Sequence, residues 1–121
     1  MLFRSSDEME DRFAQQLKKG VLEMLVLKLI CRKAAYGYEL LSRLKGSSEG
    51  LFTLKEGTLY PILYRLEDDG MITASWTVGE GKVAPKKIYT ATDKGREENL
   101  RRQVCWQEFR TMVDAMLKEE E

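Results

Sequence analysis

The chain has 121 residues, 20 basic and 20 acidic side chains, and 43% hydrophobic residues, which allows one domain with a modest core. It contains no histidine and two widely separated cysteines, Cys31 and Cys105, which excludes a zinc site and a histidine-dependent triad or general base. No apolar run is long enough to span a membrane and segment 1–11 is too charged for a signal peptide, so we expect a cytoplasmic protein with no membrane partner, metal or cofactor.

The N-terminal third predicts two separate helices. Met9, Phe13 and Leu17 recur four residues apart, which indicates a short amphipathic helix that ends near Gly20 and serves as a docking arm. Segment 21–30 is almost wholly apolar, as expected of a helix surrounded by other helices. We therefore predict an arm followed by a distinct core helix.

Two further helices are predicted before residue 71. The first follows Gly37 and ends before the loop 46–50. Its apolar side is formed by Tyr38, Leu40, Leu41 and Leu44. The second has apolar residues at helical spacing, namely Leu59, Ile62, Leu63 and Leu66. Pro61 leaves two starts open for this helix: near 58–60 with Pro61 in the first turn, or a turn earlier with a bend. The earlier start is favoured.

The remainder predicts a hairpin and a long helix. Segments 72–78 and 86–90 are rich in β-branched and aromatic residues around the glycine-containing turn 79–81, which is typical of two paired strands. Thr92 can cap the following helix with its hydroxyl, and we expect that helix to run to about Lys118.

The final helix carries an apolar stripe that requires a cover. The body of the domain can cover part of it, but a helix that follows a hairpin more often packs against a partner, so we predict a homodimer. The predicted interface residues are Leu100, Val104, Cys105, Trp106, Phe109, Met112, Val113 and Met116. Both cysteines are expected to be buried and unreactive, Cys31 in the core helix and Cys105 in this stripe.

Three helices followed by a hairpin is the order of a winged helix-turn-helix, a mainly α fold with a small β-hairpin, here extended by a long C-terminal helix. In that fold the third helix enters the major groove of DNA. Side chains on this helix that can contact phosphates or base edges are Lys55, Glu56, Thr58, Tyr60, Tyr64 and Arg65. The same residues also fit the solvated side of an ordinary helix.

Three lysines of the hairpin, Lys82, Lys86 and Lys87, are predicted to form a cationic tip. Lysines near DNA phosphates add affinity without sequence choice. They fit equally well a role in protecting an exposed strand edge.

Several motifs together resemble the PadR family of transcriptional regulators. They are GTLYPILYRLEDDGMI at 57–72, YGYEL at 36–40, PKKIY at 85–89 and TDKG at 92–95. The resemblance covers about residues 17 to 100. It implies a winged-helix repressor that binds operator DNA, a dimer built on a single C-terminal helix, and in many members release from DNA by a small aromatic or drug-like ligand.

The resemblance also extends the list of candidate residues. It adds Tyr36, Tyr38 and Pro61 to the predicted DNA contacts. It places Trp106, with Phe109 and Phe13, at a speculative ligand pocket between subunits, although Trp106 also fits an ordinary interface aromatic.

Two departures from the family pattern stand out. The wing strand carries Ile88, Thr90 and Ala91 where the family usually has a second tyrosine, a basic residue and a leucine, which implies fewer phosphate contacts than usual. Lys55 stands where a capping Ser or Asn is common, which leaves Thr53 or water to satisfy the helix start.

The combined hypothesis is a PadR-type repressor that binds a pseudo-palindromic operator as a homodimer. Its expected parts are an N-terminal arm (1–19), a DNA-binding domain (20–92) and a dimerisation helix (93–121). The alternative is a winged-helix module for protein–protein interaction without DNA binding, which a net charge of zero slightly favours. An enzyme is not expected, because the chain has no nucleophile–base pair, metal cluster or phosphate loop.

Overall fold

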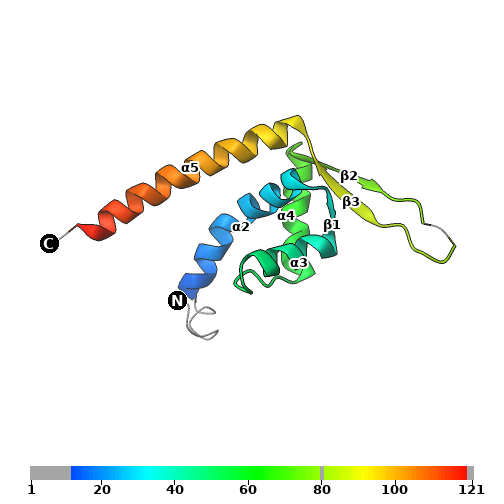
Figure 1. The fold of residues 1–121 in the computed structure, drawn as a ribbon, viewed down its shortest axis with the longest axis horizontal. Coiled ribbons are helices and arrows are strands. Elements are labelled where there is room, and N and C mark those ends of the chain that lie inside the picture. Colours follow the sequence, from blue (N-terminus) through cyan, green and yellow to red (C-terminus); the bar gives the residue numbers. More distant parts are fainter. Residues whose placement is uncertain (1–11, 80, 120–121) are drawn as a thin grey trace.

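The computed structural model describes residues 12–79 and 81–119, in which three helices and a small sheet form the body and a long helix projects from it (Figure 1). The elements in chain order are α2 (Arg12–Arg32), β1 (Ala35–Tyr36), α3 (Gly37–Ser47), α4 (Glu56–Asp68), β2 (Ile72–Trp76), β3 (Lys87–Ala91) and α5 (Asp93–Lys118). Met9 of the predicted arm and Glu80 of the predicted turn lie outside the described residues.

The first described helix, α2, corrects the prediction of two helices separated at Gly20. It runs without a break from Arg12 to Arg32. A glycine inside a helix costs only about 1 kcal/mol relative to alanine, and burial of Leu22, Val26 and the following apolar residues holds the C-terminal half. The helix therefore crosses the predicted boundary between the arm and the DNA-binding domain. The division into three parts stays a prediction.

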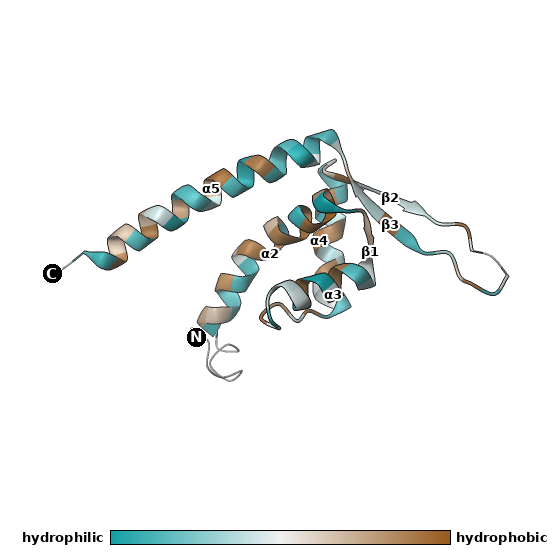
Figure 2. Cartoon of the chain, in the orientation of Figure 1, coloured by the Kyte–Doolittle hydropathy of each residue, from teal (hydrophilic) through white to brown (hydrophobic). Residues whose placement is uncertain are grey.

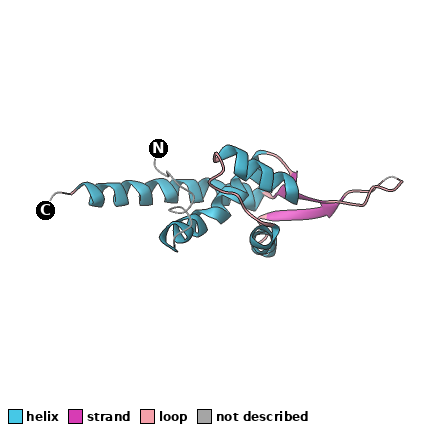
Figure 3. Cartoon of the chain, turned by 90° about the horizontal axis from the view of Figure 1, so that it is seen from below, coloured by secondary structure: helices cyan, strands magenta, loops and turns pink. Residues whose placement is uncertain are grey.

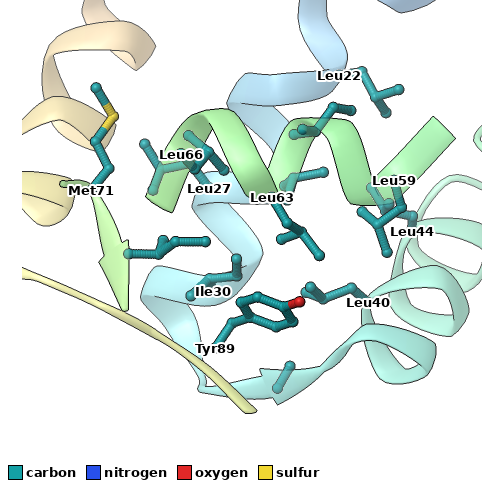
Figure 4. Close-up of a cluster of buried hydrophobic side chains, with 14 residues drawn as sticks. Leu22, Leu27, Ile30, Leu40, Leu44, Leu59, Leu63, Leu66, Met71 and Tyr89 are labelled. Atoms are coloured by element: carbon teal, nitrogen blue, oxygen red, sulfur yellow. The ribbon is translucent and has the colours of Figure 1, made fainter. Parts of the chain in front are cut away.

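The core lies where α2, α3 and α4 meet the sheet (Figure 4). Most of its largest fully buried side chains are leucines from the helical stripes, among them Leu27, Leu40, Leu59 and Leu63. Each such side chain contributes roughly 1.5–3 kcal/mol when it leaves water. Tyr38, which the spacing assigned to the apolar side of α3, is instead 56% exposed, because it lies at the first turn of the helix beyond the edge of the core.

The sheet confirms the hairpin and adds a strand that the sequence did not predict. Strands β2 and β3 pair antiparallel, and β1 joins the other side of β3, giving the order β1-β3-β2. Tyr89 of β3 lies opposite both Ala35 and Ala74, and its ring is buried beside Ile30 and Leu40 in the core (Figure 4). The two-residue strand β1 is too short to show a periodicity.

Helix α5 begins where the sequence predicts. The Thr92 hydroxyl accepts the Gly95 N–H at 3.0 Å and donates to the Gly70 carbonyl at 2.7 Å, which caps α5 and joins it to the turn after α4. A Cβ at Gly95 would lie 2.0 Å from the Met71 carbonyl oxygen, so only glycine allows this close crossing. Beyond that point α5 extends away from the body in both views (Figures 1 and 3), and apolar residues recur along it (Figure 2).

Candidate nucleic-acid interface and apolar groove

Helix α4 starts without a side-chain cap. Lys55 occupies the capping position, and its carbonyl accepts the N–H groups of Thr58 and Leu59 at 3.0 and 3.2 Å. The favoured early start is confirmed, since Pro61 lies inside the helix rather than in its first turn. The prediction that Thr53 satisfies this turn is wrong: its hydroxyl donates to the Gly50 carbonyl at 2.8 Å. Among the residues that the structure describes, no side chain accepts from the N-terminal N–H groups of α4, a situation in which helix starts bind anions.

The outer face of α4 presents the residues that the sequence proposed for DNA contact. Its buried side consists of Leu59, Ile62, Leu63 and Leu66. The residues Lys55, Glu56, Thr58, Tyr60, Pro61, Tyr64 and Arg65 are all exposed. Burial of the leucine stripe therefore fixes the orientation of this polar and aromatic face.

Tyr60 belongs to an aromatic cluster with the start of α3. A Cβ at Gly37 would lie 2.6 Å from the Tyr60 hydroxyl oxygen, so the phenol end occupies the space that a side chain at this position would need. Close by in the chain, the rings of Tyr36 and Tyr38 stack with centroids 5.8 Å apart and planes 5° from parallel. The Lys86 Nζ lies 5.7 and 5.3 Å from these two centroids.

A second cluster forms around Lys87, with rings from α4 and from both strands of the hairpin. Its Nζ lies 6.0 Å from the ring centroids of Tyr64 and Trp76 and 5.8 Å from that of Tyr89. Burial raises the pKa of the Tyr89 phenol, followed by smaller effects of Tyr60 and Glu67, so this ring stays neutral. The sequence did not identify Trp76 as a site residue, because its position opposite Lys87 depends on the strand register.

The predicted cationic tip is corrected by these contacts. Lys86 and Lys87 lie where the paired strands end and the hairpin loop begins, where Thr77 and Lys86 exchange hydrogen bonds and each lysine faces aromatic rings. Lys82 and Lys86 are both exposed and lie in the loop between the strands, whereas Lys87 is the first residue of β3 and is half-buried. Lys86 and Lys87 therefore do not gather at the end of the wing: Lys86 faces Tyr36 and Tyr38 at the start of α3, and Lys87 faces Tyr64 of α4.

Arg65 has a partner that the sequence did not reveal. Its Nε donates to Glu23 Oε1 of α2 at 2.9 Å, while Arg102 of α5 lies 3.3 Å from Glu23 Oε2. Arg102 also contacts Glu98 at 3.4 Å and the Met71 sulfur at 3.6 Å. One carboxylate thus joins α2, α4 and α5. Arg65 remains 59% exposed, at the edge of the outer face of α4.

An apolar groove of about 1020 Å³ runs between α2 and α5. Its lining includes Trp106, Phe109, Cys105 and Val113 of the predicted interface. The Trp106 and Phe109 rings lie 6.3 Å apart. Its other apolar lining residues include Leu17, Val21, Met24, Leu51 and Phe52. Of the three residues assigned to a ligand pocket, the structure brings Trp106 and Phe109 into this groove, while Phe13 is exposed and outside its lining.

The rest of the predicted dimer stripe is exposed in the single chain. Leu100, Val104, Met112 and Met116 are 58–66% exposed. Cys105 is exposed in the single chain as well, and its burial in a dimer interface stays a prediction. Cys31 is partly buried; its thiol donates weakly to the Gly95 carbonyl at 3.8 Å, and burial raises its pKa against the opposing effects of Arg96 and Lys28.

Within 12–79 and 81–119 no cluster of acidic or thiol side chains could hold a metal ion. Over the same ranges, no helix has the length and hydropathy needed to cross a bilayer.

The model of the "Transcriptional regulator PadR-like family" matches residues 26–101. The chain belongs to this family. Its members are transcriptional regulators rather than enzymes. The match includes α4, the sheet and both aromatic clusters and ends at Arg101, before Trp106 and most of the exposed stripe.

Individual PadR-like proteins agree with this assignment. The negative transcriptional regulator PadR of Bacillus subtilis is 35% identical over 78 residues, 64% of this chain but only 42% of that protein. An uncharacterised protein of Lysinibacillus sphaericus is 30% identical over 83% of this chain and 91% of its own length. A PadR family structure from Eggerthella lenta superposes with a TM-score of 0.82 at 31% identity, covering 94% of this chain and 96% of that one. The winged-helix fold with a long C-terminal helix is thereby confirmed.

Proposed function

We propose that this PadR-like protein is a transcriptional repressor that binds a pseudo-palindromic operator as a homodimer. The observation that carries the proposal is the exposed outer face of α4, together with two hairpin lysines near exposed aromatic rings: Lys86 beside Tyr38 of α3 and Lys87 beside Tyr64 of α4. Hydroxyl and phenol groups contact phosphates and base edges, and lysines neutralise phosphates. The Bacillus subtilis relative is a negative transcriptional regulator by name, which supports repression.

The DNA-contact residues proposed are those of α4, the aromatic clusters and the hairpin: Tyr36, Tyr38, Lys55, Thr58, Tyr60, Pro61, Tyr64, Arg65, Lys82, Lys86 and Lys87. Thr58 and Tyr60 lie near the N-terminal end of α4, where the positive end of the helix dipole favours a phosphate. In the dimer, two α4 helices enter successive major grooves about 34 Å apart.

The proposed dimer interface is the apolar side of α5. A contiguous exposed apolar surface on a soluble chain marks an interaction site, and the exposed residues of α5 continue directly into the groove against α2. A second copy supplies the same apolar helix and therefore fits this surface. The space left between the two copies near Trp106 and Phe109 is the proposed site of a small aromatic or drug-like inducer. Such a ligand acts only through its different affinity for the two arrangements of the dimer.

Fluorescence anisotropy with DNA from the region upstream of the gene tests the proposal. We expect binding of wild type that weakens steeply with salt, and losses of at least about tenfold, or ~1.4 kcal/mol, in Tyr60→Ala and Lys86→Ala. Lys45→Ala is the matched control, because Lys45 is an exposed lysine in the last turn of α3, away from the two clusters. Absence of salt-sensitive binding in wild type would favour the protein–protein interaction module instead.

A further inference from the structure

The second lysine cluster contains an exposed aromatic side chain to which the proposed interface gives no role. Trp76 is 67% exposed and Tyr64 70% exposed, yet both rings lie about 6.0 Å from the same ammonium group, that of Lys87. A tryptophan that is kept in water beside a cation does not stabilise the core. It offers a rigid apolar surface with a fixed positive charge at its side.

The strand register shows which way this surface faces. Trp76 and Lys87 are directly opposite each other on β2 and β3, as are Ala74 and Tyr89 further along. Residues directly opposite in an antiparallel pair share a face, and the burial of Tyr89 shows that this is the face toward the helices. Trp76 therefore lies on the helix-facing side of the hairpin, at the end where the hairpin has left the core, and faces the same space as Tyr64 of α4.

The space between α4 and the hairpin is lined by charges of both signs. An open depression there is lined by Tyr64, Arg65, Glu67, Asp68 and Lys87. The carboxylates of Glu67 and Asp68 repel an anion, whereas Lys87 attracts one, and its ammonium lies 6.0 Å from the centroid of the Trp76 ring. The Tyr64 hydroxyl is available as a hydrogen-bond donor. The Lys87 ammonium and the Tyr64 hydroxyl are thus combined with the apolar face of the Trp76 indole.

We propose that Trp76 and Lys87 form a seat for one DNA strand, in which Lys87 and the Tyr64 hydroxyl hold a phosphate and the Trp76 ring packs against the adjoining deoxyribose. This inference rests on the proposed DNA binding, and it gives a role to Trp76, which no sequence motif identified. A DNA backbone alternates anionic phosphates with largely apolar sugar faces, which is the chemistry that an ammonium beside an indole complements. The three rings also hold Lys87 in place before DNA arrives, which lowers the entropy cost of ordering it.

The test compares Trp76→Ala, Trp76→Phe and Lys87→Ala by DNA anisotropy at several salt concentrations. We expect Trp76→Ala to weaken binding about tenfold, or ~1.4 kcal/mol, with an unchanged dependence on salt, and Trp76→Phe to retain most of the affinity. Lys87→Ala should reduce the slope of log affinity against log salt by about 0.9, the value for one phosphate contact. Val78→Ala is the control, because Val78 is an apolar hairpin residue that is 92% exposed and outside the cluster.

A fluorescence measurement gives a second readout of the same contact. In a Trp106→Phe background Trp76 is the single tryptophan, and its emission should change on addition of DNA with the midpoint that anisotropy gives for that same variant. Unchanged emission together with wild-type affinity in Trp76→Ala would overturn the seat while leaving the proposed function intact. Wild type that shows no salt-sensitive binding to any duplex would overturn both.

Discussion

The Arg65 guanidinium is bound to Glu23 of α2, with 2.9 Å between Nε and Oε1. To contact DNA, Arg65 must exchange the Glu23 carboxylate for a phosphate or a base, and the loss of the ion pair reduces the net free energy gained on binding. Glu23→Gln keeps the shape and removes the charge. We expect DNA affinity to rise by about two- to fivefold. The free energy of unfolding should fall by about 1 kcal/mol, because Glu23 is only 29% exposed and pairs with Arg102 as well as with Arg65. Anisotropy and urea unfolding measure the two effects.

Glu97→Gln is the matched control for that change. It removes the same charge from an exposed position of α5 outside the carboxylate network around Arg65. An equal gain in both variants would mean that only the overall charge matters. Weaker binding in Glu23→Gln would show that Glu23 orients Arg65 toward DNA instead of holding it back.

The contact between Gly37 and Tyr60 gives a second prediction. An alanine Cβ at position 37 would lie 2.6 Å from the Tyr60 hydroxyl oxygen and 3.2 Å from the ring carbon that carries it. Tyr60 must then move, and we expect Gly37→Ala to bind DNA at least about fivefold, or ~1 kcal/mol, more weakly. Because the displaced atoms form the free end of a side chain, the stability should change much less than the affinity.

Gly46→Ala in the same helix serves for comparison. No atom lies within 4 Å of a Cβ built there, and alanine is favoured over glycine in a helix by up to about 1 kcal/mol. This variant should be slightly more stable in urea and bind DNA as wild type does. A parallel loss of affinity in both glycine variants would contradict the proposed role of Tyr60.

The two cysteines should differ in reactivity. Only the thiolate reacts with a disulfide reagent, and burial raises the pKa of Cys31, whereas Cys105 is exposed on α5. At low protein concentration we expect fast labelling at Cys105 in Cys31→Ala and slow labelling at Cys31 in Cys105→Ala. If a second copy covers α5, labelling of Cys105 slows as the concentration rises. A rate at Cys105 that is independent of concentration would count against the proposed interface.

The Glu98 carboxylate should make the stability of the fold depend on pH. Hydrogen bonding from Arg101, together with its charge and that of Arg102, lowers the pKa of the Glu98 carboxyl despite the opposing effect of burial. A carboxyl with a lower pKa in the folded state stabilises the fold above its unfolded pKa, and that stabilisation is lost as the pH falls through the folded value. Wild type should therefore exceed Glu98→Gln in stability at neutral pH, and the difference should shrink below about pH 4. Urea unfolding as a function of pH measures this; a constant difference would contradict the assignment.

Local sequence patterns were sufficient for most of the fold. The leucines of α4 recur at the spacing that buries one side of a helix, and Thr92 has the side chain and position of a helix cap; both features involve residues only a few positions apart. Such patterns also predicted which face of α4 is exposed. They placed an end at Gly20 wrongly, because the cost of one glycine is small compared with the burial further along α2.

The partners of site residues required the tertiary structure. Glu23 and Arg65 are 42 positions apart, and Glu23 and Arg102 are 79 apart; no periodicity connects such residues. The position of Trp76 beside Lys87 depends on the register across the hairpin loop, which a shift of one residue would reverse. Lysine content alone therefore indicated a cationic hairpin, while the aromatic surroundings of each lysine emerged only from the fold.

Helix α5 acts mechanically as a lever arm. Its 26 residues span about 39 Å at 1.5 Å per residue, and it is held near its first turns, by the close crossing of Gly95 over Met71 and by the bond of Arg102 to Glu23. For a rod of that length, a tilt of about 5° at the base displaces the far end by about 3 Å. Side-chain rearrangements too small to alter the core are thus magnified along α5. In an assembly joined through this helix, the separation of the two α4 helices is set by an angle that a few contacts at its base control.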